Sequence, residues 1–197
     1  MGSEMCIRDS DVAVKLAQKQ DKQLNPVSYV NPDVKVLPEV YSNLFATFVH
    51  SFRNAVDHGI EMPDVRTSVG KTPAGTITVS FEHHRQPDVD LLVIRIDDDG
   101  NGINTVKIRE KLASKGVEAH QESDAEVIQH IFDSQFSTRD EVTETSGRGV
   151  GMDAIKHAAE ELGGRVWVES TQGKGTSLVV EVPYITDLLP QRRLKVA

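Results

Sequence analysis

Residues 39–58 constrain the fold more than any other segment, because they carry the strongest helix signal in the chain. Pro38 precedes the segment and Gly59 follows it, and these residue types are typical start and stop signals. At about 100° per residue, the apolar side chains fall on one arc of the predicted helix. The arc, which we predict to face the core, consists of Leu44, Phe45, Phe48, Val49, Phe52, Ala55 and Val56.

The opposite arc of this helix carries His50, Arg53, Asn54, Asp57 and His58. A solvated face usually carries Lys, Glu and Gln, which are better helix formers, whereas His, Asn and Asp are better at coordination and hydrogen bonding. His50 and Asn54 are four residues apart and project side by side. An amide oxygen beside a neutral imidazole can hold a hard metal ion together with water and phosphate. An ordinary solvated face is the alternative interpretation.

The predicted strands come in pairs. Residues 76–81 and 91–96 are joined by a Gln-Pro-Asp turn, which predicts an antiparallel hairpin. A second hairpin is predicted from residues 165–170 and 176–182. Further helices are predicted at residues 12–22, 104–115 (with Asn104 as N-cap), 124–131 and 150–162. Strands paired in hairpins favour an α+β sandwich with a mixed or antiparallel sheet over a doubly wound parallel sheet.

Charge and composition exclude several classes of protein. The chain has 30 acidic and 22 basic side chains, and the resulting charge of −8 argues against a nucleic-acid partner. Cys6 is the one cysteine, which excludes a disulfide framework and fits a reducing compartment, so we expect a cytoplasmic location. No apolar run approaches the ~20 residues of a membrane span, so we expect no membrane contact. We assign residues 1–10 to an added or disordered leader, 11–190 to a single domain and 191–197 to a tail.

An acidic, glycine-rich turn at residues 97–103 closes one predicted strand. Its spacing matches the first half of a calcium loop, but the twelfth position is Ile108 instead of Glu, and a strand precedes it, which excludes calcium. The pattern Asp98-x-Gly100-x-Gly102 instead predicts a turn that a flat ligand can approach closely. A buried carboxylate there can accept a hydrogen bond from an exocyclic amine, as on adenine. The alternative is a surface turn with solvated Asp side chains.

Two further features suit phosphate groups. Lys107 and Lys111 lie four residues apart on a predicted helix and can act as point charges, although simple solvation is the alternative. Residues 146–153 read Ser-Gly-Arg-Gly-Val-Gly-Met-Asp and lead into a helix, where free backbone N–H groups form an anion site. The spacing is neither a Walker A loop nor G-x-G-x-x-G. The long polar stretch before it, residues 133–148, favours a lid.

Taken in order, these motifs resemble the ATP-binding domain shared by histidine kinases, gyrase-type topoisomerases, Hsp90 and MutL. The resemblance covers residues 34–183 and is strongest to the kinase domain of CheA-type chemotaxis kinases, through the string His-Ser-Phe-Arg-Asn-Ala-Val-Asp-His-Gly at residues 50–59. It implies the Bergerat fold, a two-layer sandwich whose mixed, mostly antiparallel sheet is covered by helices on one face. The chain departs from the family at residues 132–135, where relatives have a more apolar Pro-Gly string.

The resemblance also implies ATP and Mg²⁺ as cofactors and assigns roles to individual residues. The implied catalytic residues are His50, Asn54 and Arg53, with Asn54 and His50 at the metal. Asp98 is implied to bind the adenine amino group. The remaining nucleotide-binding residues implied by the resemblance are Asp57, His58, Gly100, Gly102, Ile103, Lys107, Lys111, Phe136, Ser137, Thr138, Gly147, Arg148, Gly149, Val150, Gly151, Met152 and Thr176.

The function implied by the resemblance is transfer of the γ-phosphate of ATP to a His on a separate domain, with a response regulator downstream. His50 is therefore not the phosphorylated residue. We recognise no dimerisation hairpin and expect the isolated domain to be a monomer. An ATP-hydrolysing clamp is one alternative, but such clamps usually have an acidic base one turn before the Mg²⁺-binding Asn, where this chain has His50. A non-enzymatic nucleotide sensor is the other alternative.

Overall fold

A five-stranded mixed sheet forms the centre of the protein in the computed structural model, which describes residues 2–133 and 151–186 and the side chains from residue 11 onward. The strands are β1 (Ser28–Val30), β2 (Ile77–His84), β3 (Leu91–Asp98), β4 (Arg165–Thr171) and β5 (Gly175–Pro183), in the order β1-β2-β3-β5-β4. β1 runs parallel to β2, and every other neighbouring pair is antiparallel. The predicted α+β class with a mixed, mostly antiparallel sheet is confirmed.

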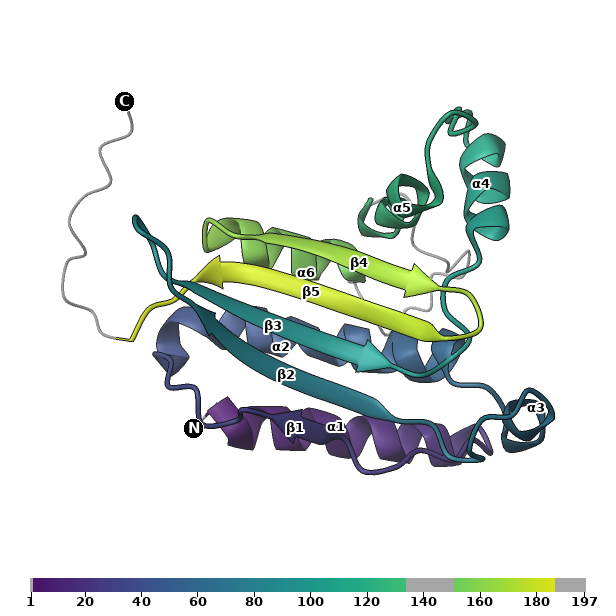
Figure 1. Ribbon diagram of the computed structural model, residues 1–197, viewed down its shortest axis with the longest axis horizontal. Coiled ribbons are helices and arrows are strands. Elements are labelled where there is room, and N and C mark those ends of the chain that lie inside the picture. Colours follow the sequence, from purple (N-terminus) through teal and green to yellow (C-terminus); the bar gives the residue numbers. More distant parts are fainter. Residues whose placement is uncertain (1, 134–150, 187–197) are drawn as a thin grey trace, which may run out of the picture.

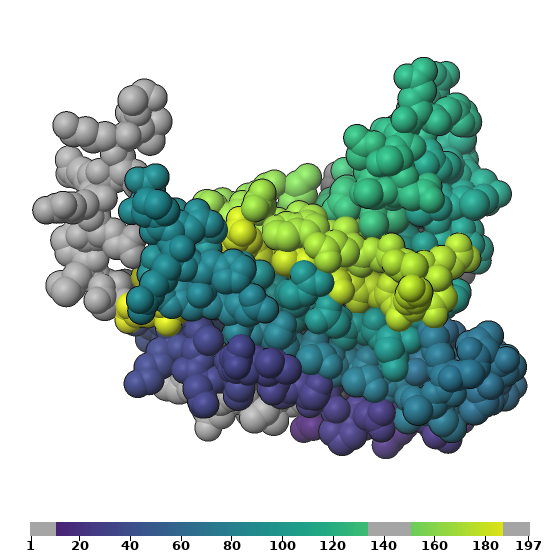
Figure 2. Space-filling model, viewed as in Figure 1, coloured from purple at the N-terminus to yellow at the C-terminus, as the bar shows by residue number. Residues whose placement is uncertain are grey.

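The longer helices lie on one face of this sheet. Figure 1 shows α1 (Gly2–Lys19), α2 (Pro38–Asn54) and α6 (Met152–Glu161) together behind the strands. α4 (Thr105–Ser114) lies beyond one end of the sheet. α5 (Asp124–Val127) and the 3₁₀ helix η2 (Ile128–Phe132) lie beside the β4 edge, where the Gln129 side chain hydrogen-bonds with the backbone of Val168. Side chains of the strands form the opposite face, which is turned toward the viewer in Figure 2. The expected covering of one face by helices is therefore confirmed.

The core lies between the sheet and α2. Alternate strand residues point into it, so that one row of register partners (Val79, Ile96, Leu178 and Val168) is buried from β2 across to β4. The predicted apolar arc of α2 packs against these rows, with Leu44, Phe48 and Phe52 at most 1% exposed. Val49 is the one member of that arc that is only partly buried. Each fully buried large side chain contributes about 1.5–3 kcal/mol of transfer free energy.

The structure differs from the sequence prediction at both ends of α1. The helix begins at Gly2 instead of Val12, and it ends at Lys19 instead of Lys22. It ends early because Asp21 adopts φ 56°, a left-handed conformation that a helix cannot continue through. α1 packs on α2 through Ala13 and Ala17, which are at most 1% exposed. The first ten residues carry no apolar period, so the pattern did not predict this part of the helix.

Other differences concern short elements. The predicted helix at residues 124–131 is a single turn, α5, capped by Ser123 and Glu126, followed by η2. α3 (Pro63–Ser68) was not predicted, because six residues are too few for a helical period to be recognised. No helix in the part of the chain that the structure describes is long and apolar enough to cross a membrane.

The long predicted helix at residues 39–58 is not α-helical throughout. α2 ends at Asn54, and a π-helical turn, η1 (Ala55–Gly59), follows it. In this wider turn the backbone N–H of Ile60 donates to the carbonyl of Ala55 at 2.7 Å, five residues earlier. The extra residue per turn changes the direction in which Gly59 leaves the helix.

Candidate functional site

Three segments that are distant in sequence meet where β3 ends. Asp98 is the last residue of β3 and lies opposite Thr176 of β5. The backbone N–H of Gly100 donates to Oδ1 of Asp98 at 2.9 Å, and the N–H of Asn101 donates to the carbonyl oxygen of Gly59 at 2.8 Å. The structure thus brings together the end of η1, the turn after β3 and the start of β5.

The Asp98 carboxylate has the most perturbed electrostatics in this region. Burial raises its pKa to about 6, against the opposing effect of hydrogen bonds from the backbone of Gly100 and Thr176. The negative charges of Asp99 and Glu61 raise the pKa further. Among the described residues, no Lys, Arg or His forms an ion pair with Asp98. A carboxylate has about four acceptor positions, so Asp98 can accept additional hydrogen bonds from a ligand.

The two glycines of the turn are required for its packing. A Cβ at Gly100 would overlap the backbone of Gly59, so the turn can only approach η1 closely with glycine here. Gly102 has φ +70°, and a Cβ there would overlap the carbonyl of Thr171 at the end of β4. The protein's own backbone therefore occupies the space that a Cβ would take at each of these glycines.

The polar arc of α2 lies beside the start of α6. His50 and Asn54 are partly buried, whereas Arg53 and His58 are exposed. Burial and the charge of Arg53 lower the pKa of His50, and Asp153 in the first turn of α6 opposes that shift. The imidazole is therefore neutral at neutral pH, which is the form that binds metal ions. Gly151, the N-cap of α6, donates its N–H to Asp153 Oδ1 at 3.0 Å, so the end of the glycine-rich loop also lies in this region.

Asp57 lies on the same arc but is held by a different element. Its Oδ1 accepts a hydrogen bond from Gln20, just after α1, at 2.6 Å. Lys22 donates to the carbonyls of Val56 and Asp57, so its ammonium lies at the C-terminal end of η1. Neither Gln20 nor Lys22 was among the predicted residues, since nothing in the sequence links positions more than 30 residues apart.

The remaining predicted residues lie at the edge of this region or outside the described residues. Lys107 and Lys111 are on α4, whose N-cap is Asn104 as predicted, with Oδ1 accepting from the Lys107 N–H at 3.1 Å. The N–H of Ile103 donates to Ser170 Oγ at 2.8 Å and so ties this turn to β4. Met152 is the first residue of α6. Positions outside the described residues are Phe136, Ser137, Thr138, Gly147, Arg148, Gly149 and Val150.

The donor atoms present suit a metal ion that is bound mostly by other ligands. Within residues 11–133 and 151–186, no three His, Cys, Asp or Glu side chains are grouped so that they could hold an ion. Asn54 and His50 alone supply at most two protein ligands. Mg²⁺ is commonly bound in this way, because it keeps several waters and takes the rest of its ligands from phosphates.

Comparison with known proteins identifies the family. Residues 42–186 match the family described as histidine kinase-, DNA gyrase B-, and HSP90-like ATPase. The chain belongs to this family. The family that the motifs predicted is therefore confirmed.

Relatives of known name are similar to nearly the whole chain. Chemotaxis protein CheA of Halobacterium salinarum is 42% identical over 85% of this chain and 25% of its own length. The gliding motility regulatory protein of Myxococcus xanthus is 39% identical, with 86% and 22% covered. CheA of Salmonella typhimurium is 36% identical, with 92% and 26% covered. The chain thus spans about a quarter of the length of these relatives and is CheA-like in sequence.

Proposed function

We propose that this chain is the catalytic ATP-binding domain of a CheA-like histidine kinase. It binds Mg-ATP and positions the γ-phosphate for in-line attack by a His on another domain or chain. The observation that carries the proposal is the partly buried Asp98 carboxylate, which accepts only backbone hydrogen bonds among the described residues and directly adjoins η1. A carboxylate that is buried without a cation is costly, and an adenine amino group is a donor that would offset this cost.

At the adenine end, the ionised Asp98 accepts from the exocyclic amine. Thr176 lies directly across the strand pair, with its Oγ1 3.3 Å from Ser170 Oγ, and forms the neighbouring wall of the site. Because the pKa of Asp98 is about 6, the carboxylate is mostly ionised at neutral pH, which is the state that accepts from an amine.

At the phosphate end, Asn54 and the neutral His50 would hold Mg²⁺ together with phosphate oxygens. The ion supplies neutralisation of the charge that develops on the transferred phosphoryl group. The exposed Arg53, together with Lys107 and Lys111, adds positive charge around the phosphates. At the start of α6 the N–H groups of Gly151 and Ala154 donate to Asp153 Oδ1, so the N–H groups of Met152 and Asp153 are the ones there that would contact phosphate. Most of the catalysis is thus positioning and electrostatic stabilisation.

The proposal extends to partners and organisation. The phosphate acceptor is a His-containing domain of the same or a partner chain, and a response regulator receives the phosphate afterwards. Residues 11–190 form a single domain. The isolated domain is a monomer in the cytoplasm without nucleic-acid or membrane contacts.

A family member of the clamp type would hydrolyse ATP with water. The specific observation against that function is His50, which lies one turn before Asn54 where a clamp has an acidic base. Steady-state hydrolysis by the isolated chain distinguishes the two. We expect little turnover without a His-containing acceptor, and rapid turnover without one would favour the clamp.

Calorimetric titration of the folded chain with ATP or ADP and Mg²⁺ tests nucleotide binding. We expect saturable binding that Asp98→Asn weakens strongly. Asp97→Asn is the matched control, because Asp97 is the preceding residue but points to the other face of β3. There its Oδ1 lies 3.7 Å from Nη2 of Arg95. Absence of binding at millimolar nucleotide, with folding verified by circular dichroism, would refute the proposal.

A further inference from the structure

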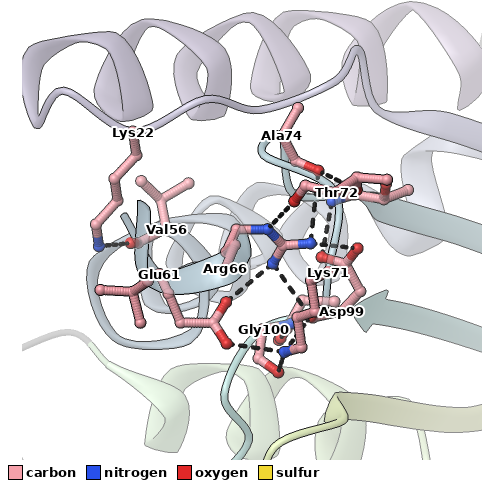
Figure 3. A network of polar contacts seen from close by, with 12 residues as sticks. Lys22, Val56, Glu61, Arg66, Lys71, Thr72, Ala74, Asp99 and Gly100 are labelled. Atoms are coloured by element: carbon pink, nitrogen blue, oxygen red, sulfur yellow. Dashed lines mark hydrogen bonds and ion pairs between the residues drawn. The ribbon is translucent and has the colours of Figure 1, made fainter. Parts of the chain in front are cut away.

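Next to the Asp98 turn lies a cluster of three charged residues, Glu61, Arg66 and Lys71, which we call the Arg66 cluster (Figure 3). The Arg66 side chain is 1% exposed and that of Lys71 18%. All three come from the segment between η1 and β2, which contains α3. Charged side chains are almost never buried to this degree unless they are fully paired.

Arg66 connects this segment to the turn. Its guanidinium donates to Glu61 Oε2 at 2.9 Å, to the carbonyl oxygen of Asp99 at 3.2 Å and to Asp99 Oδ2 at 2.8 Å. It also donates to the carbonyl of Thr72 at 2.8 Å, which closes the segment on itself. Arg66 thus holds both the backbone and the side chain of Asp99.

Lys71 binds the same piece of backbone. Its Nζ donates to the carbonyl oxygens of Asp99 at 2.9 Å and of Gly100 at 2.7 Å, and to Glu61 Oε1 at 2.8 Å. An ammonium has three donors, and all three are used. Glu61 holds the two cations side by side, with one carboxylate oxygen on each.

The important consequence concerns a single peptide group. The carbonyl of Asp99, which accepts from both cations, belongs to the same planar peptide as the N–H of Gly100. That N–H points the opposite way and donates to Asp98 Oδ1 at 2.9 Å. Holding the carbonyl therefore fixes the direction of the N–H, and two cations on the oxygen polarise the peptide so that the N–H becomes a better donor.

We propose that Glu61, Arg66 and Lys71 are positioning residues for adenine recognition, which orient Asp98 through the Asp99–Gly100 peptide. The inference rests on the proposed function, because it assigns a role to residues that do not touch the nucleotide. The cations of the Arg66 cluster contact the Asp99 carbonyl instead of Asp98, so the cluster orients the Asp98 carboxylate without forming an ion pair with it.

The test uses Lys71→Met, because Lys71 is partly exposed and its loss is less disruptive than that of the buried Arg66. Calorimetry measures the affinities for ADP and for inosine diphosphate, which has a carbonyl in place of the exocyclic amine. We expect the preference for ADP to fall about tenfold, the size expected for one charge-assisted hydrogen bond, with inosine diphosphate binding changed less than about twofold. Lys35→Met, at an exposed position outside the site, is the matched control.

The pH dependence of ADP binding provides a second measurement. Weakening the Gly100 hydrogen bond and removing a nearby cation both raise the pKa of Asp98, so the midpoint should move to higher pH in Lys71→Met. The negative charges of Asp99 and Glu61 raise the pKa of Asp98. Glu61→Gln removes one of these charges and should therefore move the midpoint to lower pH, opposite to the shift in Lys71→Met. An unchanged preference and midpoint, or equal losses for both nucleotides, would overturn the positioning role. A wild-type chain that bound neither nucleotide would overturn the proposed function itself.

Discussion

The neighbouring carboxylates Asp98 and Asp99, at the turn after β3, have opposite environments. Asp98 is partly buried against η1 and β5, accepts only backbone hydrogen bonds among the described residues, and has a raised pKa. Asp99 points to the other side, where Oδ1 accepts from the N–H of Thr76 at 2.9 Å and Oδ2 from Arg66 at 2.8 Å. Successive residues in extended backbone alternate in direction, so one residue step separates a carboxylate used for structure from one available to a ligand.

The difference shows how a fold keeps a buried carboxylate free for recognition. Cations that stabilise the turn are needed nearby, yet a cation on Asp98 itself would lower its pKa and occupy its acceptor positions. The chain places both cations on the carbonyl side of the Asp99–Gly100 peptide, and among the described residues Asp98 accepts from backbone N–H groups alone. Contacts on the Asp99 side of the turn should therefore determine the free energy of unfolding, and Asp98 should determine the affinity for the nucleotide.

The largest effect is expected from removing the cation on the Asp99 side. Arg66→Met leaves Glu61 and Asp99 without their buried partner, and we expect a loss of about 3–5 kcal/mol in the free energy of unfolding, measured with urea. Arg165→Met is the matched control, because Arg165 is 70% exposed and pairs only with Glu181 among the described acidic residues. It should lose at most about 1 kcal/mol. Equal losses in the two variants would contradict the division between the two sides.

Asp98→Asn should have the opposite profile. We expect ADP affinity to fall about 10- to 100-fold, the range for a hydrogen bond to a charged group. The free energy of unfolding at pH 7 should rise, because the variant removes a buried charge that has no cationic partner. Calorimetry and urea unfolding of the same samples measure both effects. Loss of stability together with affinity would mean that Asp98 is structural after all.

Titration of Asp98 predicts how binding and stability vary with pH. With a pKa of about 6, the ionised fraction falls about tenfold from pH 7 to pH 5, so ADP should bind correspondingly more weakly at pH 5 while inosine diphosphate does not. The folded state holds this proton to higher pH than the unfolded state does. The stability difference between Asp98→Asn and wild type should therefore grow from about pH 4 to pH 6 and stay constant above. A difference that is flat across this range would contradict the raised pKa.

The smallest effect is expected at the phosphate end of the site. Asn54→Ala should reduce the gain in ADP affinity on adding Mg²⁺, measured against EDTA, by several-fold, on the order of one lost metal ligand. The preference for ADP over inosine diphosphate should be unchanged, because the adenine end is not altered. His157→Ala, at an exposed position of α6, is the control. A changed base preference in Asn54→Ala would show that the two ends are not separable.

The sequence predicts well what is encoded locally. The hairpins, the apolar arc of α2 and the Asp98 turn each occupy a short continuous string, and the structure brings η1, this turn and β5 together. The Arg66 cluster could not be predicted, because Arg66 and Lys71 are 33 and 28 residues from Asp99 in the sequence, and only the folded chain brings them together. The spacing to Gly100 and Gly102 singles out Asp98, but the pairing of Asp99 with Arg66 could not be predicted for the same reason.

The π-helical turn η1 makes the number of residues in this segment as important as their chemistry. Deleting one residue between Ala55 and Gly59 would restore ordinary α-helical geometry, rotate the helix exit by about 100° and shorten it by about 1.5 Å. The N–H of Asn101 would then lose the Gly59 carbonyl, which it contacts at 2.8 Å. Such a deletion would separate the metal end of the site from the adenine end although every side chain named above outside η1 was still present.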